Sequence, residues 1–169
     1  MAARPIVLGL VSDTHGLLRP EILDVLRGSD RIVHAGDVGD PAILEALARL
    51  APLTVVRGNV DEGDWADRLP ATATIEAGPG MRLLVIHDLG ALEGDPAAAG
   101  FGAVVHGHSH RPGSFRKHGV LYVNPGSAGP RRFSLPISAG RLVVAGDALS
   151  VELVPIEAAP IRRRNRSSA

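Results

Sequence analysis

The sequence predicts an α/β fold in four layers, α/β/β/α, in which two β-sheets pack together with helices outside them. Up to about residue 60, short apolar segments alternate with helical patterns, the order of parallel strands joined by helices. After residue 70, short strand-like segments dominate, separated by turns that carry Gly or Pro. Hydrophobic residues make up 45% of the 169 residues, which is enough for a sizeable core.

Three strands and a first helix are expected between residues 6 and 56. Ile6–Val11 (IVLGLV) is apolar on both faces, which is typical of a buried central strand. A helix should begin near Pro20 and end at Gly28. Arg31–Ala35 and Leu53–Val56 are the second and third strands, and all three should be parallel with right-handed crossovers.

A second helix is expected between the second and third strands. Asp40 and Pro41 predict an N-cap followed by proline at the first helical position. The apolar stripe of this helix is Ile43, Leu44, Leu47 and Leu50.

The second half of the chain predicts seven short strands and one further helix. The helix is expected between Pro96 and Ala99. The strands are expected at Ala73–Ala77, Arg82–Ile86, Ala103–Val105, Ser114–Lys117, Val120–Val123, Leu142–Ala145 and Ser150–Val154.

Composition excludes several classes of protein. The chain has no cysteine, so disulfides, thiolate nucleophiles and cysteine-bound metals are excluded. Residues 162–169 hold four of the 18 basic groups and no acid, which leaves residues 1–161 with 14 basic against 18 acidic groups. We therefore expect one domain over 1–161 with an acidic body that argues against nucleic-acid binding, and a basic, disordered tail over 162–169.

The chain shows no sign of export or membrane insertion. The apolar run at residues 5–11 is too short for a signal sequence, and no run approaches the ~20 residues of a membrane span. We expect a cytoplasmic protein without a membrane partner. An exposed strand edge could support a homodimer, although no decisive surface patch predicts one.

Polar residues with metal-binding side chains follow five of the apolar runs. Because the carboxyl ends of strands in an open α/β sheet share one edge, these side chains should converge there. Glycines beside them suit close backbone approaches. The seven candidate ligands are Asp13, His15, Asp37, Asn59, His87, His108 and His110.

Seven oxygen and nitrogen ligands are too many for one ion with open positions, but they suit two. Asp37, on the central turn, is the natural bridging carboxylate. Asp13 and His15 form an i, i+2 pair, as do His108 and His110, so in extended backbone both members of a pair would face the same way. We expect two divalent ions per chain, with Mn²⁺ favoured and Fe, Zn²⁺, Co²⁺ or Ni²⁺ as alternatives. Their net positive charge favours an anionic phosphoryl substrate.

In order, the motifs DxH, GD, GN, H and GHxH, with VRGNVD (56–61) and NPGS (124–127), resemble the calcineurin-like metallophosphoesterases, in particular their small bacterial and archaeal phosphodiesterase branch. The resemblance covers about residues 6–154. It implies a metallophosphoesterase-like sandwich of two mixed β-sheets flanked by helices, and attack on phosphorus by a metal-bound hydroxide. It also implies ligand roles: one metal on Asp13, His15 and His110, the other on Asn59, His87 and His108, and Asp37 as the bridge.

The sequence departs from that family at three places. Many members carry a histidine directly after the asparagine that protonates the leaving group, and here it is Val60. Asp88 follows His87 where relatives often show Gly-His, and His106 stands before GHSH where an apolar residue is expected. Either the leaving group must then be a good one, or Asp61, Asp88 or water must act as the acid. The residues that we expect to take part in catalysis are Asp37, Asn59, Asp61 and His87.

The function expected from these residues is hydrolysis of small phosphodiesters, including cyclic-nucleotide-like ones. Three alternatives stay open. One is a non-catalytic binding module with the same fold, like an endosomal-coat subunit that has lost ligand residues. The other two are a phosphomonoesterase, which Val60 argues against, and a nuclease, which the acidic body argues against.

Overall fold

The computed structural model describes residues 3–157 as a sandwich of two five-stranded sheets, which confirms the predicted fold class. The predicted basic tail at 162–169 lies outside the described residues. None of the described helices is long and apolar enough to span a membrane.

The first sheet has the strand order β10-β9-β1-β2-β3. Its parallel strands β1, β2 and β3 match the predicted ones, and β9 runs antiparallel to β1. The bounds are β1 Ile6–Val11, β2 Arg31–His34, β3 Leu53–Val55, β9 Ile137–Ala145 and β10 Ala148–Ile156. The last two form one long hairpin, whereas the sequence predicted only short segments of each.

The second sheet has the order β4-β5-β6-β8-β7, with β5, β6 and β8 parallel and antiparallel strands at both edges. The bounds are β4 Thr72–Glu76, β5 Arg82–Ile86, β6 Ala103–Val105, β7 Gly113–Lys117 and β8 Val120–Asn124. Each of these strands overlaps a predicted one.

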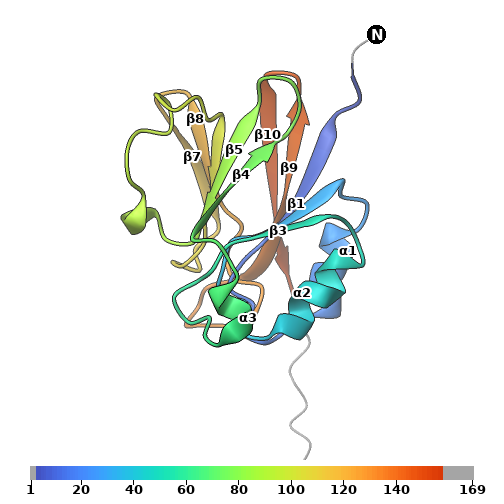
Figure 1. The fold of residues 1–169 in the computed structure, drawn as a ribbon. Coiled ribbons are helices and arrows are strands. Elements are labelled where there is room, and N and C mark those ends of the chain that lie inside the picture. The colour runs from blue at the N-terminus through green and yellow to red at the C-terminus, as the bar shows by residue number, and fades with distance from the viewer. Residues whose placement is uncertain (1–2, 158–169) are drawn as a thin grey trace, which may run out of the picture.

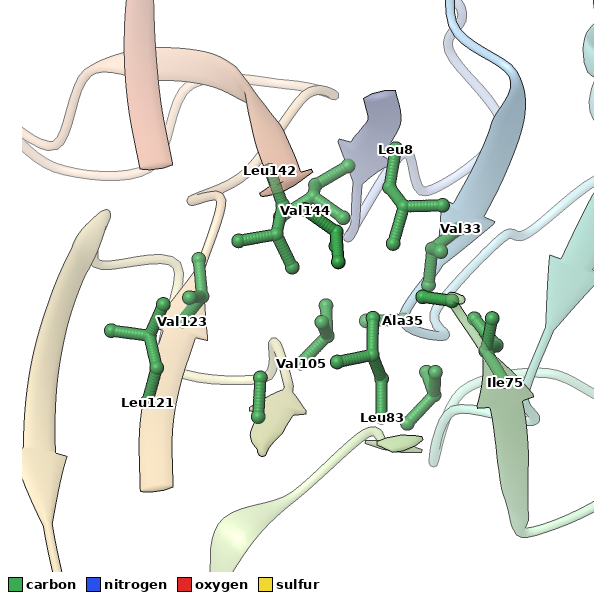
Figure 2. Close-up of a cluster of buried hydrophobic side chains, with 14 of the residues drawn as sticks. Leu8, Val33, Ala35, Ile75, Leu83, Val105, Leu121, Val123, Leu142 and Val144 are labelled. Atoms are coloured by element: carbon green, nitrogen blue, oxygen red, sulfur yellow. The ribbon is translucent and has the colours of Figure 1, made fainter. Parts of the chain in front are cut away.

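The main core lies between the two sheets (Figure 2). Its side chains come from the inward faces of β1, β2 and β9 on one side and of β4, β5, β6 and β8 on the other. The labelled members are Leu8, Val33, Ala35, Ile75, Leu83, Val105, Leu121, Val123, Leu142 and Val144. This packing fixes the two sheets against each other, so loops from both can build a single site.

Helices α1 (Pro20–Leu26) and α2 (Pro41–Ala48) cover the outer face of the first sheet (Figure 1). Asp40 caps α2 as predicted, because its Oδ1 accepts a 2.8 Å hydrogen bond from the N–H of Ala42. The sequence missed the one-turn helix α3 (Asp64–Asp67), which is too short to show an apolar stripe.

The outer face of the second sheet has a thinner cover. The 3₁₀ turn η1 (Leu89–Ala91) and the loop after it pack on Ile86, Val104, Val120 and Tyr122. The helix predicted between Pro96 and Ala99 is wrong, because residues 96–100 form a turn. The turn ends at Gly100 with φ +81°, which stops a helix from propagating.

Candidate metal centre

All seven predicted ligands lie in loops at the carboxyl ends of five strands. Asp13 and His15 follow β1, Asp37 follows β2, and Asn59 follows β3. His87 follows β5, and His108 and His110 follow β6. Two glycines permit the close approach of these loops. A Cβ at Gly58 would fall on the backbone of Asp37, and one at Gly107 would lie 2.7 Å from Oδ2 of Asp13.

One group of side chains consists of Asp13, His15 and His110. Nε2 of His110 lies 3.3 Å from Oδ1 of Asp13, and Nε2 of His15 lies 3.8 Å from the same oxygen. The two imidazole nitrogens are 3.2 Å apart. Three donor atoms therefore face a common point, at the spacing from which one ion could be held.

A second group consists of Asn59, His87 and His108. Oδ1 of Asn59 lies 3.0 Å from Nε2 of His87 and 3.0 Å from Nδ1 of His108. The two ring nitrogens are 3.3 Å apart. This group therefore also brings three donor atoms together.

Asp37 lies between the two groups. Its Oδ2 is 3.7 Å from Nε2 of His15 and 3.3 Å from Nε2 of His87. Its Oδ1 accepts a hydrogen bond of 3.0 Å from the N–H of Val60, which fixes the carboxylate. One oxygen of Asp37 thus lies within 4 Å of a histidine nitrogen in each group.

The paired ligands meet for a different reason from the one predicted. The i, i+2 argument assumed extended backbone, and this was wrong. Asp13 has φ +55°, His15 +44°, His108 +68° and His110 +59°. Asp37 has φ +56°, so among residues 3–157 five of the seven non-glycine residues with positive φ are candidate ligands. Such left-handed backbone is costly and tends to gather at functional sites.

The ring orientation of His87 suits a cation. Its Nδ1 lies 2.7 Å from the carbonyl oxygen of Ala35, so Nδ1–H donates to that carbonyl and Nε2 faces the centre. Around Nε2 stand the acceptor oxygens of Asp37 and Asn59. Lone pairs that converge in this way need a proton or a cation between them. Asp13 Oδ1 is also buried without a hydrogen-bond partner among residues 3–157.

The pKa shifts keep most of these groups in the form that binds metal. Burial raises the pKa of Asp13 to about 6, which still leaves the carboxyl ionised at pH 7. Burial and the charge of Arg132 lower the pKa of His110 to about 4, and burial lowers the pKa of His15. Burial opposes the charged forms of Asp37 and His87, but their mutual hydrogen bond lowers the pKa of Asp37 and raises that of His87. A proton on His87 thus occupies a place that a cation would take.

His34 lies behind the centre and supports it by a hydrogen bond to the backbone. Its Nδ1 accepts from the N–H of Gly36 at 3.2 Å, and its Nε2 lies 2.9 Å from Oγ1 of Thr14. Burial lowers its pKa to about 3, so the ring is neutral. The contact joins the loops that carry Asp13 and Asp37.

Two further supporting residues carry no chemical signal in the sequence. Ser12 donates from Oγ to Oδ2 of Asp13 at 2.7 Å. Asn124 closes a turn, because its Oδ1 accepts from the N–H of Gly126, and its Nδ2 donates to the carbonyl of Gly107 at 3.0 Å. Only the folded chain brings these residues next to the loops they support.

The departures from the family pattern also lie near the centre. Val60 is 43% exposed. Asp61 is buried, and its two oxygens accept from the N–H groups of Gly39 and Gly58 at 2.9 and 2.8 Å. Asp88 accepts from the N–H of Gly90, and burial lowers the pKa of His106 to about 4. Asp61 therefore links the backbone of Gly39 and Gly58, next to the candidate ligands Asp37 and Asn59.

The loop between β8 and β9 runs along the same site. The N–H of Gly129 donates to the carbonyl of Asp13 at 3.2 Å. Arg132 is exposed and near enough to lower the pKa of both His15 and His110. This loop adds positive charge beside the centre.

The chain is similar in sequence to known proteins. A protein named probable metallophosphoesterase from Methanocaldococcus jannaschii is 30% identical over 164 residues, covering 89% of this chain and 82% of the relative.

Two solved structures share the fold. A phosphoesterase from E. coli, YfcE, has a TM-score of 0.64 at 20% identity, with 88% of this chain and 99% of that chain covered. The zinc complex of Vps29 from Entamoeba histolytica has a TM-score of 0.67 at 19% identity, with 89% and 99% covered. Residues 6–147 match the calcineurin-like phosphoesterase superfamily domain, and the chain belongs to that family.

Proposed function

We propose that this protein is a phosphodiesterase that works with two divalent metal ions. Asp13, His15 and His110 would hold one ion, and Asn59, His87 and His108 the other, with Asp37 shared between them. When bound, such ions supply Lewis acidity and lower the pKa of water at the site. The observation that carries the proposal is the position of Asp37 Oδ2 between the two groups, 3.7 Å from His15 and 3.3 Å from His87.

Charge at the site supports an anionic substrate. Four positive charges from two ions would face the two carboxylates of Asp13 and Asp37, and Arg132 adds a further positive charge nearby. A phosphoryl group of the substrate would therefore be attracted and oriented. We favour Mn²⁺, and the oxygen and nitrogen donors suit Fe, Zn²⁺, Co²⁺ or Ni²⁺ about equally well.

The preference for diesters rests on the missing proton donor. Val60 cannot protonate a leaving group, and Asp61 has both oxygens engaged by backbone N–H groups. Leaving groups that depart as stable anions need no acid. Small diesters with activated or cyclic ester bonds fit this site better than alkyl phosphomonoesters. The predicted homodimer and the cytoplasmic location stay predictions.

The test compares two substrates on protein loaded with Mn²⁺. We expect turnover of bis-p-nitrophenyl phosphate and a clearly lower kcat/KM for phenyl phosphate, a monoester whose poorer leaving group would need a proton donor. Asp37→Asn should lose at least a hundredfold in rate and should hold less metal, measured by elemental analysis of the purified chain. Asp40→Asn is the matched control, because Asp40 only caps α2. A chain that holds two metals and turns over neither ester would overturn the proposal.

A scaffold function is the second candidate, and the likeness to Vps29 favours it. Because the Entamoeba histolytica Vps29 structure is a zinc complex, metal binding alone does not separate the two functions. All seven candidate ligands are present in this chain, which favours the enzyme. Metal-loaded protein that is inert toward phosphoesters but forms a stable complex with another protein would favour the scaffold.

A further inference from the structure

A cleft of about 360 Å³ opens directly beside the second group of candidate ligands. Asn59 and His87 line both the cleft and the group, so the two spaces are continuous. A phosphoester held by these residues would therefore have one ester arm within reach of the cleft.

The walls of the cleft are small and largely apolar. They come from the segment that enters β4, from the end of β5 and from η1, and the side chains are Ala71, Thr72, Ile86 and Ala91. Its volume lies near the lower end of the range of about 300–1,000 Å³ for small-ligand pockets. A cleft of this volume can hold one ring or a short chain, and it is too small for a folded nucleic acid.

The charges at the rim disfavour a second anionic group in the cleft. Nη1 of Arg57 is paired with Asp67 at 2.9 Å, and its Nε donates to the carbonyl of Asp61 at 3.1 Å. Asp88, which also lines the cleft, is half exposed and brings a negative charge. The cleft therefore offers apolar contact without an unpaired positive charge.

We propose that this cleft binds an uncharged, ring-sized ester arm of the substrate, so that the substrates are small diesters with an aryl or similar flat substituent. The inference rests on the proposed function, because the metal ions would hold the phosphoryl group. It adds a specificity site: Ala71 and Ala91 set the width of the cleft and thereby the size of the arm that fits.

The test measures binding rather than turnover, with ligands whose C–P bond resists hydrolysis. Phenylphosphonate and methylphosphonate are titrated calorimetrically into protein loaded with Mn²⁺. The metal centre should bind the phosphonate group of both ligands, and only the phenyl ring can use the cleft. We expect phenylphosphonate to bind about tenfold more tightly, because part of the ring leaves water.

Variants that narrow the cleft should remove this difference. Ala71→Phe and Ala91→Phe should bring the affinity for phenylphosphonate down to that for methylphosphonate and leave the latter unchanged. Ala98→Phe is the matched control, because Ala98 is exposed in the nearby turn at 96–100, outside the cleft lining. It should keep the tenfold preference.

The outcomes separate this inference from the proposed function. If methylphosphonate binds but phenylphosphonate binds no more tightly, or if Ala71→Phe and Ala91→Phe both keep the preference, the cleft inference is overturned and the metal centre stands. If metal-loaded protein binds neither phosphonate, the proposed function and the inference both fall.

Discussion

The carboxylate of Asp13 is positioned as a candidate ligand, and its burial lowers the free energy of unfolding. The carboxylate is fully buried, and its Oδ2 accepts hydrogen bonds from Oγ of Ser12 and the N–H of His108. Its Oδ1 has no hydrogen-bond partner among the described residues and faces His110. Burial raises the pKa of this carboxyl to about 6. An ionised Asp13 without a nearby cation therefore destabilises the folded chain at neutral pH.

Asp13→Asn should stabilise the metal-free protein at pH 7. Asparagine can still accept from Ser12 and His108, and it carries no charge. A folded-state pKa near 6 against about 3.8 in the unfolded chain means that stability is lost as pH rises from about 4 to 6, by about 3 kcal/mol at pH 7. Urea unfolding in EDTA should show this gain at pH 7 and little of it at pH 4.

With metal bound, Asp13→Asn should instead be less stable than the wild type, because the variant lacks a candidate ligand. Asp147→Asn, at an exposed turn, is the control, and it should change the unfolding free energy neither in EDTA nor with metal bound. A variant that is less stable than the wild type in EDTA at pH 7 would contradict this account of Asp13.

Val60 is the residue at which the chain departs most clearly from the chemistry that the family resemblance implies. Its N–H donates to Oδ1 of Asp37, so its side chain begins beside the centre, and it is 43% exposed. A larger polar side chain can therefore be placed there without unfolding the protein.

Val60→His should raise the rate for esters with poor leaving groups. An imidazole at this position could protonate the departing oxygen, an effect typically worth 10²–10⁴-fold. We expect at least a tenfold gain in kcat/KM for phenyl phosphate and little change for bis-p-nitrophenyl phosphate. Val60→Gln, which is polar but cannot act as an acid, should give no gain. Equal effects of the two variants would show that proton donation does not limit the reaction.

At the scale of the elements, loops rather than strands set the geometry of the site. The sequence predicted the central strands because their apolar runs are continuous, and it predicted which residues follow each strand. It could not predict the positive φ of Asp13, His15, Asp37, His108 and His110. Asp and His adopt positive φ more often than most residues, but only a small fraction of them do so, and tertiary contacts decide which ones.

The same limit explains the elements that sequence analysis missed or placed wrongly. Asp64–Asp67 is one turn long, so it shows no periodic stripe. In β10, apolar and polar residues alternate visibly over only part of the strand, and pairing with β9 over nine residues extends the strand. The sequence showed Asp61 as a polar residue near a candidate ligand. The direction in which its side chain points depends on a hydrogen bond from Gly39, which lies 22 positions earlier in the chain.

Asp61 ties two ligand loops together, and its loss should act through them. Its oxygens hold the N–H groups of Gly39 and Gly58, next to the loops of Asp37 and Asn59. Asp61→Asn can accept only one of these bonds, so we expect a loss of about 2 kcal/mol in unfolding free energy. Metal affinity should fall as well, while kcat at saturating metal should stay near the wild-type value.

Asp67→Asn is the control, because the Asp67 side chain is 64% exposed and, within the described part of the chain, forms an ion pair only with Arg57 at the surface. It should cost at most a few tenths of a kcal/mol. If Asp61→Asn instead lowers kcat at saturating metal, most strongly for poor leaving groups, Asp61 is the missing proton donor and the positioning role is wrong.

At the scale of the whole molecule, the candidate ligands come from both sheets. Asp13, His15, Asp37 and Asn59 extend from the first sheet, and His87, His108 and His110 extend from the second. The two sheets otherwise meet through the apolar core between them (Figure 2). Ions bound by both sets would therefore link the sheets at the edge where the core ends.

Metal binding should thus stabilise the entire sandwich rather than a single loop. A ligand present at a hundred times its Kd adds about 2.7 kcal/mol to the unfolding free energy. Mn²⁺ should raise Tm in thermal unfolding, EDTA should reverse the rise, and the transition should stay single because both sheets are linked. His110→Gln should lose most of this rise, whereas His118→Gln, in the exposed β7–β8 turn, should keep it. A metal-induced rise that His110→Gln retains in full would mean that the ion binds outside this centre.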